Sequence, residues 1–189
     1  MTQFEARTLA EAYMFVDLVV GRNKPVDLTA LTDLDYVDGN RVLRVNGWHD
    51  GEEHDFTIVT PGRTGDTRPG ELYGTGREPS LIIDAGQWRA VEDFAASNIA
   101  ALVQQAAGGP LSPDEVNEIA NNVEVAYSAL AEIGKFLPDN AVEVPDEAFW
   151  SEIGRTIREQ QPEAFRRERL VEYEAQYRAM ADQINAARG

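Results

Sequence analysis

The chain has 189 residues, 43% of them hydrophobic, and its 33 acidic residues outnumber 17 basic ones, which gives a formal net charge of −16 at pH 7. Nucleic acids and anionic membranes are bound through lysine and arginine that neutralise phosphate, so this charge excludes both and favours a basic protein as partner. The chain has no cysteine, which excludes disulfides, thiolate zinc sites and cysteine nucleophiles.

A second interpretation of the charge stays open, in which acidity serves solubility alone. The first residues, MTQFEARTLAEAY, lack the basic start and apolar core of a signal peptide. The sequence also lacks the run of about 20 apolar residues that crosses a bilayer. We therefore expect a cytoplasmic protein.

The first 60 residues predict a small β-rich element with a short helix. Thr8 and Glu11 fit the capping box that opens a helix. The aromatic and β-branched segment Tyr13–Val20 is more typical of a strand than of a long helix. Residues 26–38 are acidic with scattered leucines and favour neither a helix nor a strand.

A β-hairpin follows. Arg41–Trp48 and His54–Val59 alternate apolar and polar residues. A two-residue turn (Asp50-Gly51) and a four-residue loop (Asp50–Glu53) both bring the two apolar sets onto one face, because their registers differ by two. Trp48 lies on the opposite, polar face, and we expect it to be an exposed aromatic. The candidate interaction residues are Trp48, Asp50, Glu52, Glu53 and Asp55.

The only two histidines of the chain, His49 and His54, flank this turn. Across a four-residue loop they would lie directly opposite each other and could bind a metal with a neighbouring carboxylate. A solvated turn fixes few ligands, so we favour an exposed polar turn and expect no metal and no cofactor.

Residues 61–80 are rich in glycine and proline and predict a long loop or linker. Residues 81–189 predict a bundle of about four helices. Asp84 opens the first, which runs to about residue 107, and Ser112 opens the second, which Pro138 ends. The third begins after Pro145 and the fourth at Pro162. We therefore predict an α+β fold, in which an N-terminal antiparallel element of a hairpin plus one strand packs on the helices.

Apolar spacing predicts which helical residues face the core. Trp88 and Trp150 are expected to be buried, and the third helix is expected to turn Phe149, Trp150, Ile153 and Ile157 inward. The apolar stripe of the last helix has nearly heptad spacing, which permits a homodimer and equally permits packing inside the bundle.

A cluster of arginines stands out against the acidic background, around the junction of the last two helices. In one interpretation they form ion pairs within the chain, such as Glu163 with Arg167. In the other they form a pocket for a small anion or carboxylate. The residues are Arg155, Arg158, Arg166, Arg167 and Arg169.

Motifs for catalysis are lacking. The sequence has no nucleophile elbow, and its glycine-rich segment Gly70–Gly76 is not followed by the Lys-Ser/Thr pair of a phosphate-binding loop. Carboxylate pairs are too numerous for any one to indicate a catalytic pair. The sequence does not decide whether the chain is an enzyme, and it favours a non-enzymatic role.

A resemblance rests on EAYMFVDL (Glu11–Leu18), GREPSLIIDAGQW (Gly76–Trp88) and AFWSEIGRTIREQQPEAFRRERL (Ala148–Leu170). These segments resemble a family of uncharacterised actinobacterial and myxobacterial hypothetical proteins, whose members carry CxxC-like pairs that suggest an N-terminal zinc ribbon. Here Val20–Asn23 and Trp48–Gly51 occupy the corresponding turns without a cysteine. The resemblance therefore implies a ribbon-like shape that has lost its metal, with the two histidines as relics.

Two functions are compatible with these features. The first is a non-enzymatic, acidic interaction module, for instance an immunity or inhibitor protein that blocks a basic partner. The alternative is an enzyme or small-anion binder that uses the arginine cluster.

Overall fold

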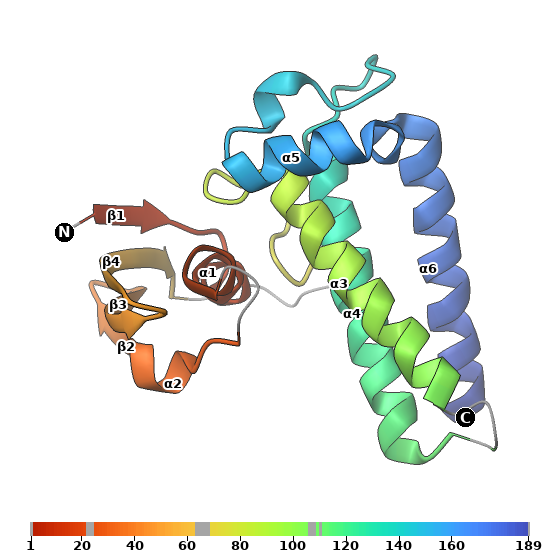
Figure 1. Cartoon of the computed structure of the whole chain (residues 1–189), viewed down its shortest axis with the longest axis horizontal. Coiled ribbons are helices and arrows are strands. Elements are labelled where there is room, and N and C mark those ends of the chain that lie inside the picture. The colour runs from red at the N-terminus through yellow and green to blue at the C-terminus, as the bar shows by residue number, and fades with distance from the viewer. Residues whose placement is uncertain (1, 22–24, 63–68, 106–108, 110, 189) are drawn as a thin grey trace. The chain divides into compact units, whose positions relative to one another are not determined.

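The computed structural model describes residues 2–21, 25–62, 69–105, 109 and 111–188, and its fold is α+β, as the sequence predicts (Figure 1). The chain divides into two compact units. The sheet unit comprises Met1–Thr67, Tyr73–Gly76 and Ser80–Ile83, and the helical unit comprises Arg68–Leu72, Arg77–Pro79 and Asp84–Gly189. Residues 61–80, which were expected to form a linker, are therefore divided between the two units. Of these, residues 63–68 lie outside the described residues.

The sheet unit is built on a four-stranded sheet with the order β1-β4-β3-β2. Its strands are β1 (Thr2–Glu5), β2 (Thr32–Val37), β3 (Asn40–His49) and β4 (Glu52–Pro61). β1 runs parallel to β4, whereas β2–β3 and β3–β4 are antiparallel. The predicted hairpin is β3–β4.

Two short turns fix the register of the antiparallel strands. Asp38-Gly39 joins β2 to β3 and Asp50-Gly51 joins β3 to β4, and all four residues have positive φ angles between 50° and 83°. Positive φ at both central positions is typical of type I′ turns, whose twist matches that of the strands. The hairpin therefore has the two-residue turn, and His49 pairs with Glu52.

The strand predicted at Tyr13–Val20 is wrong, because this segment is helical. Helix α1 (Leu9–Val16) continues as a π-helical turn (Asp17–Gly21). The Thr8 hydroxyl accepts from the Glu11 N–H, which caps the helix as the sequence predicts. Burial of Phe15 against the sheet outweighs the β propensity of the segment, since its ring lies 4.8 Å from Phe4 and 6.2 Å from Phe56.

The ambiguous residues 26–38 form a short helix, α2 (Leu28–Leu31), followed directly by β2. Leu31 packs on the same face of the sheet as Phe15. A Cβ at Gly47 would lie 2.6 Å from Leu31 Cδ2, so this close approach requires glycine.

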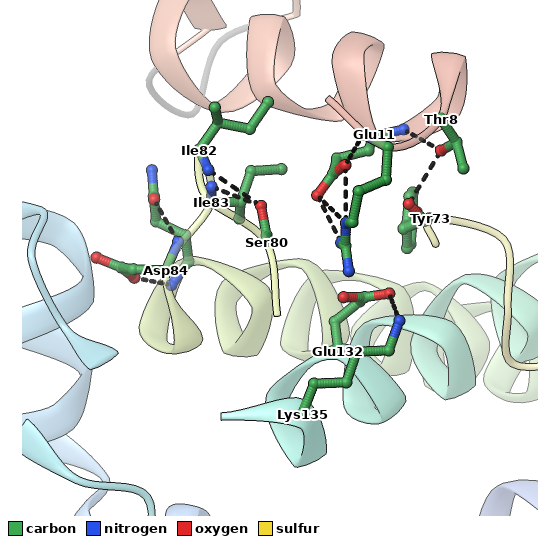
Figure 2. A network of polar contacts seen from close by, with 11 residues as sticks. Thr8, Glu11, Tyr73, Ser80, Ile82, Ile83, Asp84, Glu132 and Lys135 are labelled. Atoms are coloured by element: carbon green, nitrogen blue, oxygen red, sulfur yellow. Dashed lines mark hydrogen bonds and ion pairs between the residues drawn. The ribbon is translucent and has the colours of Figure 1, made fainter. Parts of the chain in front are cut away.

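Later segments complete the sheet unit. The Thr8 hydroxyl donates to the Tyr73 carbonyl at 3.0 Å, and the Ser80 hydroxyl accepts from the N–H groups of Ile82 and Ile83 (Figure 2). Ile83 is fully buried. The first bond fixes Tyr73 of the predicted linker beside α1, and the other two shape the turn at residues 80–83, where the bundle was predicted to begin but α3 starts only at Ala85.

The helical unit contains α3 (Ala85–Gln105), α4 (Pro113–Lys135), α5 (Glu152–Gln160) and α6 (Arg167–Arg188), with 3₁₀ turns at Asp146–Ala148 and Pro162–Phe165 (Figure 1). Four helices confirm the expected bundle. Residues 106–107, to which the first helix was expected to extend, lie outside the described residues.

Side-chain caps start α3 and α4 at the predicted places, whereas α6 begins at Arg167 and the predicted start at Pro162 is a 3₁₀ turn. Asp84 and Gln87 exchange hydrogen bonds at the start of α3, and Ser112 and Glu115 do the same at the start of α4. Each cap satisfies backbone N–H groups that the first turn of a helix leaves unpaired.

The predicted core of the bundle is correct at Trp88 and wrong at two later residues. Trp88 is fully buried, whereas Trp150 is 43% exposed and Ile153 is 37% exposed. The cause is the helix start: Ser151 caps α5, so Trp150 lies before the helix, where its ring contacts Phe136. Apolar spacing counted from Pro145 therefore assigns the wrong face.

The helices of the chain are short or polar for a membrane span. Among the described residues, none is both long and apolar enough to cross a bilayer.

Candidate functional site

The two faces of the sheet differ in what covers them. Phe15 of α1 and Leu31 of α2 pack on the face that carries Phe56 and Gly47. Side chains of successive strand residues point to opposite faces, so the pairing register defines the other face. We call it the acidic sheet face; its principal residues are Glu5, Asp33, Asp35, Arg44, Trp48, Glu53 and Asp55.

Cross-strand pairing sets the layout of this face. Glu53 lies directly opposite Trp48, and Asp55 lies directly opposite Asn46. Asp33 lies opposite Arg44. Directly opposed side chains have Cβ atoms about 5 Å apart, so Trp48 lies beside Glu53, and Asp33 lies beside Arg44 farther along β3.

One ion pair lies on the acidic sheet face. Arg44 contacts Asp35 at 2.8 Å, and both side chains are about half exposed. The remaining carboxylates have no ion pair or side-chain hydrogen bond with any residue that the structure describes; they are Glu5, Asp33, Glu53 and Asp55. Because exposed pairs are screened by water, Arg44 offsets only part of this charge.

The structure brings together three of the five predicted interaction residues. Trp48, Glu53 and Asp55 share the acidic sheet face. Glu52 pairs with His49 and points to the opposite face, and Asp50 is in the turn. The expectation that Trp48 is exposed is confirmed, since 68% of it is accessible.

Glu5, Asp33 and Asp35 also lie on the acidic sheet face and were not among the predicted interaction residues. The signal for the last two was present, because the segment TDLDYV alternates acidic and apolar residues and is followed by the turn pair Asp38-Gly39. No comparable signal marks Glu5, which reaches this face only because β1 adds in parallel beside β4.

The histidines are not directly opposed. His49 pairs with Glu52 and His54 pairs with Gly47, so the two side chains are diagonal neighbours on one face. Among the described residues, no group of three or more histidine, aspartate and glutamate side chains could hold a metal ion.

The arginine cluster of the helical unit makes contacts within the chain. Arg155 donates to the Trp150 carbonyl at 2.6 Å, and Arg158 donates to the Pro162 carbonyl at 3.0 Å. Arg158 also lies 3.3 Å from the carboxylate of Glu143. Both arginines therefore hold the segments that flank α5.

The other three arginines surround the start of α6. Arg166 pairs with Glu163 at 2.9 Å, and Arg169 pairs with Glu172. Arg167 donates to three backbone carbonyls, those of Pro138, Asp139 and Ala141. A depression of about 320 Å³ adjoins this region, lined by Val142, Glu143, Arg166, Arg167 and Glu168. Its two carboxylates offset its two arginines, which already contact Glu163 and backbone carbonyls, so the lining offers no excess positive charge to an anion.

A buried polar network inside the helical unit was not expected. On α3, Arg89 contacts Glu92 and pairs with Asp93 at 2.7 Å. Gln161 accepts from Arg89 at 3.0 Å and donates to Asp93 at 2.9 Å. Tyr177 of α6 donates to Glu92. The network therefore links α3 to the end of α5 and to α6.

Burial dominates the titration of this network. Desolvation raises the pKa of Glu92 above its usual 4.5, against the opposing effect of Arg89. Desolvation and the carboxylate of Glu92 together raise the pKa of Tyr177. We assign this network to helix packing. Its sequence signal was the spacing of Arg89, Glu92 and Asp93, because residues three and four apart on a helix can form ion pairs.

Comparison of the chain with protein-family models, with curated proteins and with solved structures found no match.

Proposed function

We propose that the chain is a non-enzymatic interaction module that binds a basic protein through the acidic sheet face. The single observation that carries the proposal is that Trp48 is exposed beside the exposed carboxylates of Glu53 and Asp55 on the acidic sheet face.

Charge supports a basic partner. The acidic sheet face has five carboxylates and one arginine, and the whole chain carries −16. Complementary charge accelerates encounter and disfavours partners of the same sign. Four of the carboxylates lack an ion pair among the described residues, so a partner's cations would not displace internal ones.

Trp48 supplies the apolar part of such an interface. Tryptophan is enriched among the few residues that contribute most of the binding energy, and its Ala variant typically costs about 2 kcal/mol or more. Charges around it would set orientation and salt dependence.

An immunity or inhibitor protein is the specific form of this proposal. In that form the acidic sheet face covers the basic working surface of a toxin or enzyme. The alternative role as an anion binder has less support, because the arginine cluster contacts carboxylates and carbonyls of its own chain.

The test is affinity capture from a lysate of the source organism, followed by titration of the purified partner. Two variants are compared with the native chain: Trp48→Ala, and Glu53→Gln combined with Asp55→Asn. We expect each to weaken binding of the captured protein by about tenfold or more.

The control removes the same charge from the helical unit, through Glu118→Gln combined with Glu147→Gln. Both residues are exposed. Binding that persists in this control and falls as salt is raised supports the proposal. The proposal is contradicted if the two charge variants weaken partner binding equally, or if none of the variants changes it.

A further inference from the structure

Strand β2 forms an edge of the sheet. It pairs with β3 on one side, and no strand among the described residues pairs with its other side. Alternate backbone N–H and C=O groups of an edge strand point away from the sheet and can bond to an added strand.

This edge lacks two common protective devices. The segment TDLDYV contains neither lysine nor proline. On one face it offers Leu34 and Tyr36, of which Tyr36 is 70% exposed. On the acidic sheet face it presents Asp33 and Asp35. An added strand would thus meet apolar side chains on one face and carboxylates on the other.

Charge disfavours a second copy of the chain as the added strand. Pairing two β2 strands would place Asp33 and Asp35 of each copy beside the same carboxylates of the other. Like charges on neighbouring strands destabilise pairing, whereas opposite charges contribute about 0.2–1 kcal/mol per pair.

We propose that the basic partner adds an extended segment to the outer edge of β2. This inference rests on the proposed function and specifies its mode. The segment alternates basic residues, which face Asp33 and Asp35, with apolar residues, which face Leu34 and Tyr36. Backbone hydrogen bonds supply affinity and the alternation supplies specificity.

The other edge of the sheet is a weaker template. β1 has four residues against six in β2, and it brings only Glu5 to the acidic sheet face as a charge. It therefore serves as the internal control.

The probe is an eight-residue peptide that alternates lysine with valine, titrated against the full chain by fluorescence anisotropy. Two modified peptides carry N-methyl groups on all lysines or on all valines. N-methylation removes the backbone donor and keeps the charge. In a strand, every second residue points its N–H group to the same edge, so either the lysines or the valines donate to β2. We therefore expect the peptide methylated on the donating residues to lose about tenfold or more in affinity, and the other modified peptide to bind nearly normally.

Two further measurements locate the site. Binding should slow hydrogen exchange at amides of residues 32–37. Asp33→Asn with Asp35→Asn should weaken binding about tenfold, whereas Gln3→Lys with Glu5→Gln, which changes the charge equally on β1, should not.

The outcomes separate this proposal from the proposed function. Equal binding by all three peptides overturns strand addition and leaves a purely electrostatic acidic sheet face. Absence of peptide binding also overturns strand addition, while capture of a partner sensitive to Trp48 would still support the function. A dimer in sedimentation that excludes the peptide would assign the edge to a second copy and overturn the proposal.

Discussion

Asp84 is the residue whose single carboxylate holds two helix starts in the helical unit. One oxygen accepts from the Gln87 N–H at 2.8 Å and the other from the Ser151 N–H at 2.7 Å. Asp84 is fully buried. Asp84→Ala leaves two backbone donors unpaired, so we expect the free energy of unfolding to fall by about 2–4 kcal/mol in urea denaturation.

Ser112→Ala is the matched control, because Ser112 caps α4 at the surface. Its loss should cost about 1 kcal/mol. If both variants lose the same amount, Asp84 acts as an ordinary cap and the shared role is contradicted.

Glu92 predicts a pH dependence of stability. Its pKa is raised in the folded state above the usual 4.5, so between these values the folded chain binds more protons than the unfolded chain. The contribution of Glu92 is therefore fully present below pH 4.5 and is lost as pH rises through the folded pKa. Glu92→Gln removes this titration and keeps an acceptor for Tyr177.

The measurement is the free energy of unfolding of both proteins from pH 4 to pH 7.5. The native chain should lose stability relative to Glu92→Gln as pH rises. A difference that stays constant across this range would show that Glu92 does not titrate there.

At the scale of elements, a glycine pair brings α3 and α5 together. A Cβ on Gly86 would overlap the backbone of Gly154, and a Cβ on Gly154 would overlap the Asp84 carboxylate. Gly86→Ala should therefore lower the free energy of unfolding by about 1–3 kcal/mol.

Gly134 in α4 gives the opposite expectation. A Cβ there meets no atom within 4 Å. Gly134→Ala should raise the free energy of unfolding by about 0.5–1 kcal/mol, since alanine has the higher helix propensity. Chemical denaturation measures the free energy of unfolding of Gly86→Ala and Gly134→Ala. If both variants change it in the same direction, the packing described is contradicted.

Local signals predicted some elements better than others. Caps at Asp84 and Ser112 act within one turn, so the sequence locates α3 and α4. The start of α1 was predicted from its cap, but its continuation through Tyr13–Val20 was predicted as a strand, because burial of Phe15, a tertiary effect, outweighs local β propensity. β1 was missed for a related reason, since a parallel partner 54 residues away defines it.

The candidate site shows the same limit. Exposure of Trp48 follows from alternation within one strand. Which residues lie beside Trp48 depends on the strand register, and the two-residue turn Asp50-Gly51 sets that register. The acidic sheet face also includes Asp33 because β2 pairs with β3. Carboxylates far apart in sequence become one surface only once strand order is known.

At the scale of the whole molecule, excess negative charge opposes folding. Repulsion among like charges favours expanded states. Selection for stability alone would therefore favour a smaller charge. The proposed binding role would account for the part of this charge that lies on the acidic sheet face, where five carboxylates accompany one arginine.

This repulsion predicts a dependence of stability on salt. The thermal midpoint should rise as NaCl is increased from 10 to 300 mM, because the screening length falls from about 30 Å to below 8 Å. Glu53→Lys with Asp55→Lys brings the net charge from −16 to −12, since each substitution adds two charges. Repulsion scales with the square of net charge, so the rise should shrink to roughly half.

Glu118→Lys with Glu147→Lys should reduce the rise of the thermal midpoint equally, yet only Glu53→Lys with Asp55→Lys should abolish partner binding. A midpoint that falls with salt would show that attractive ion pairs outweigh repulsion, and equal loss of binding in both variants would show that the partner responds to net charge alone.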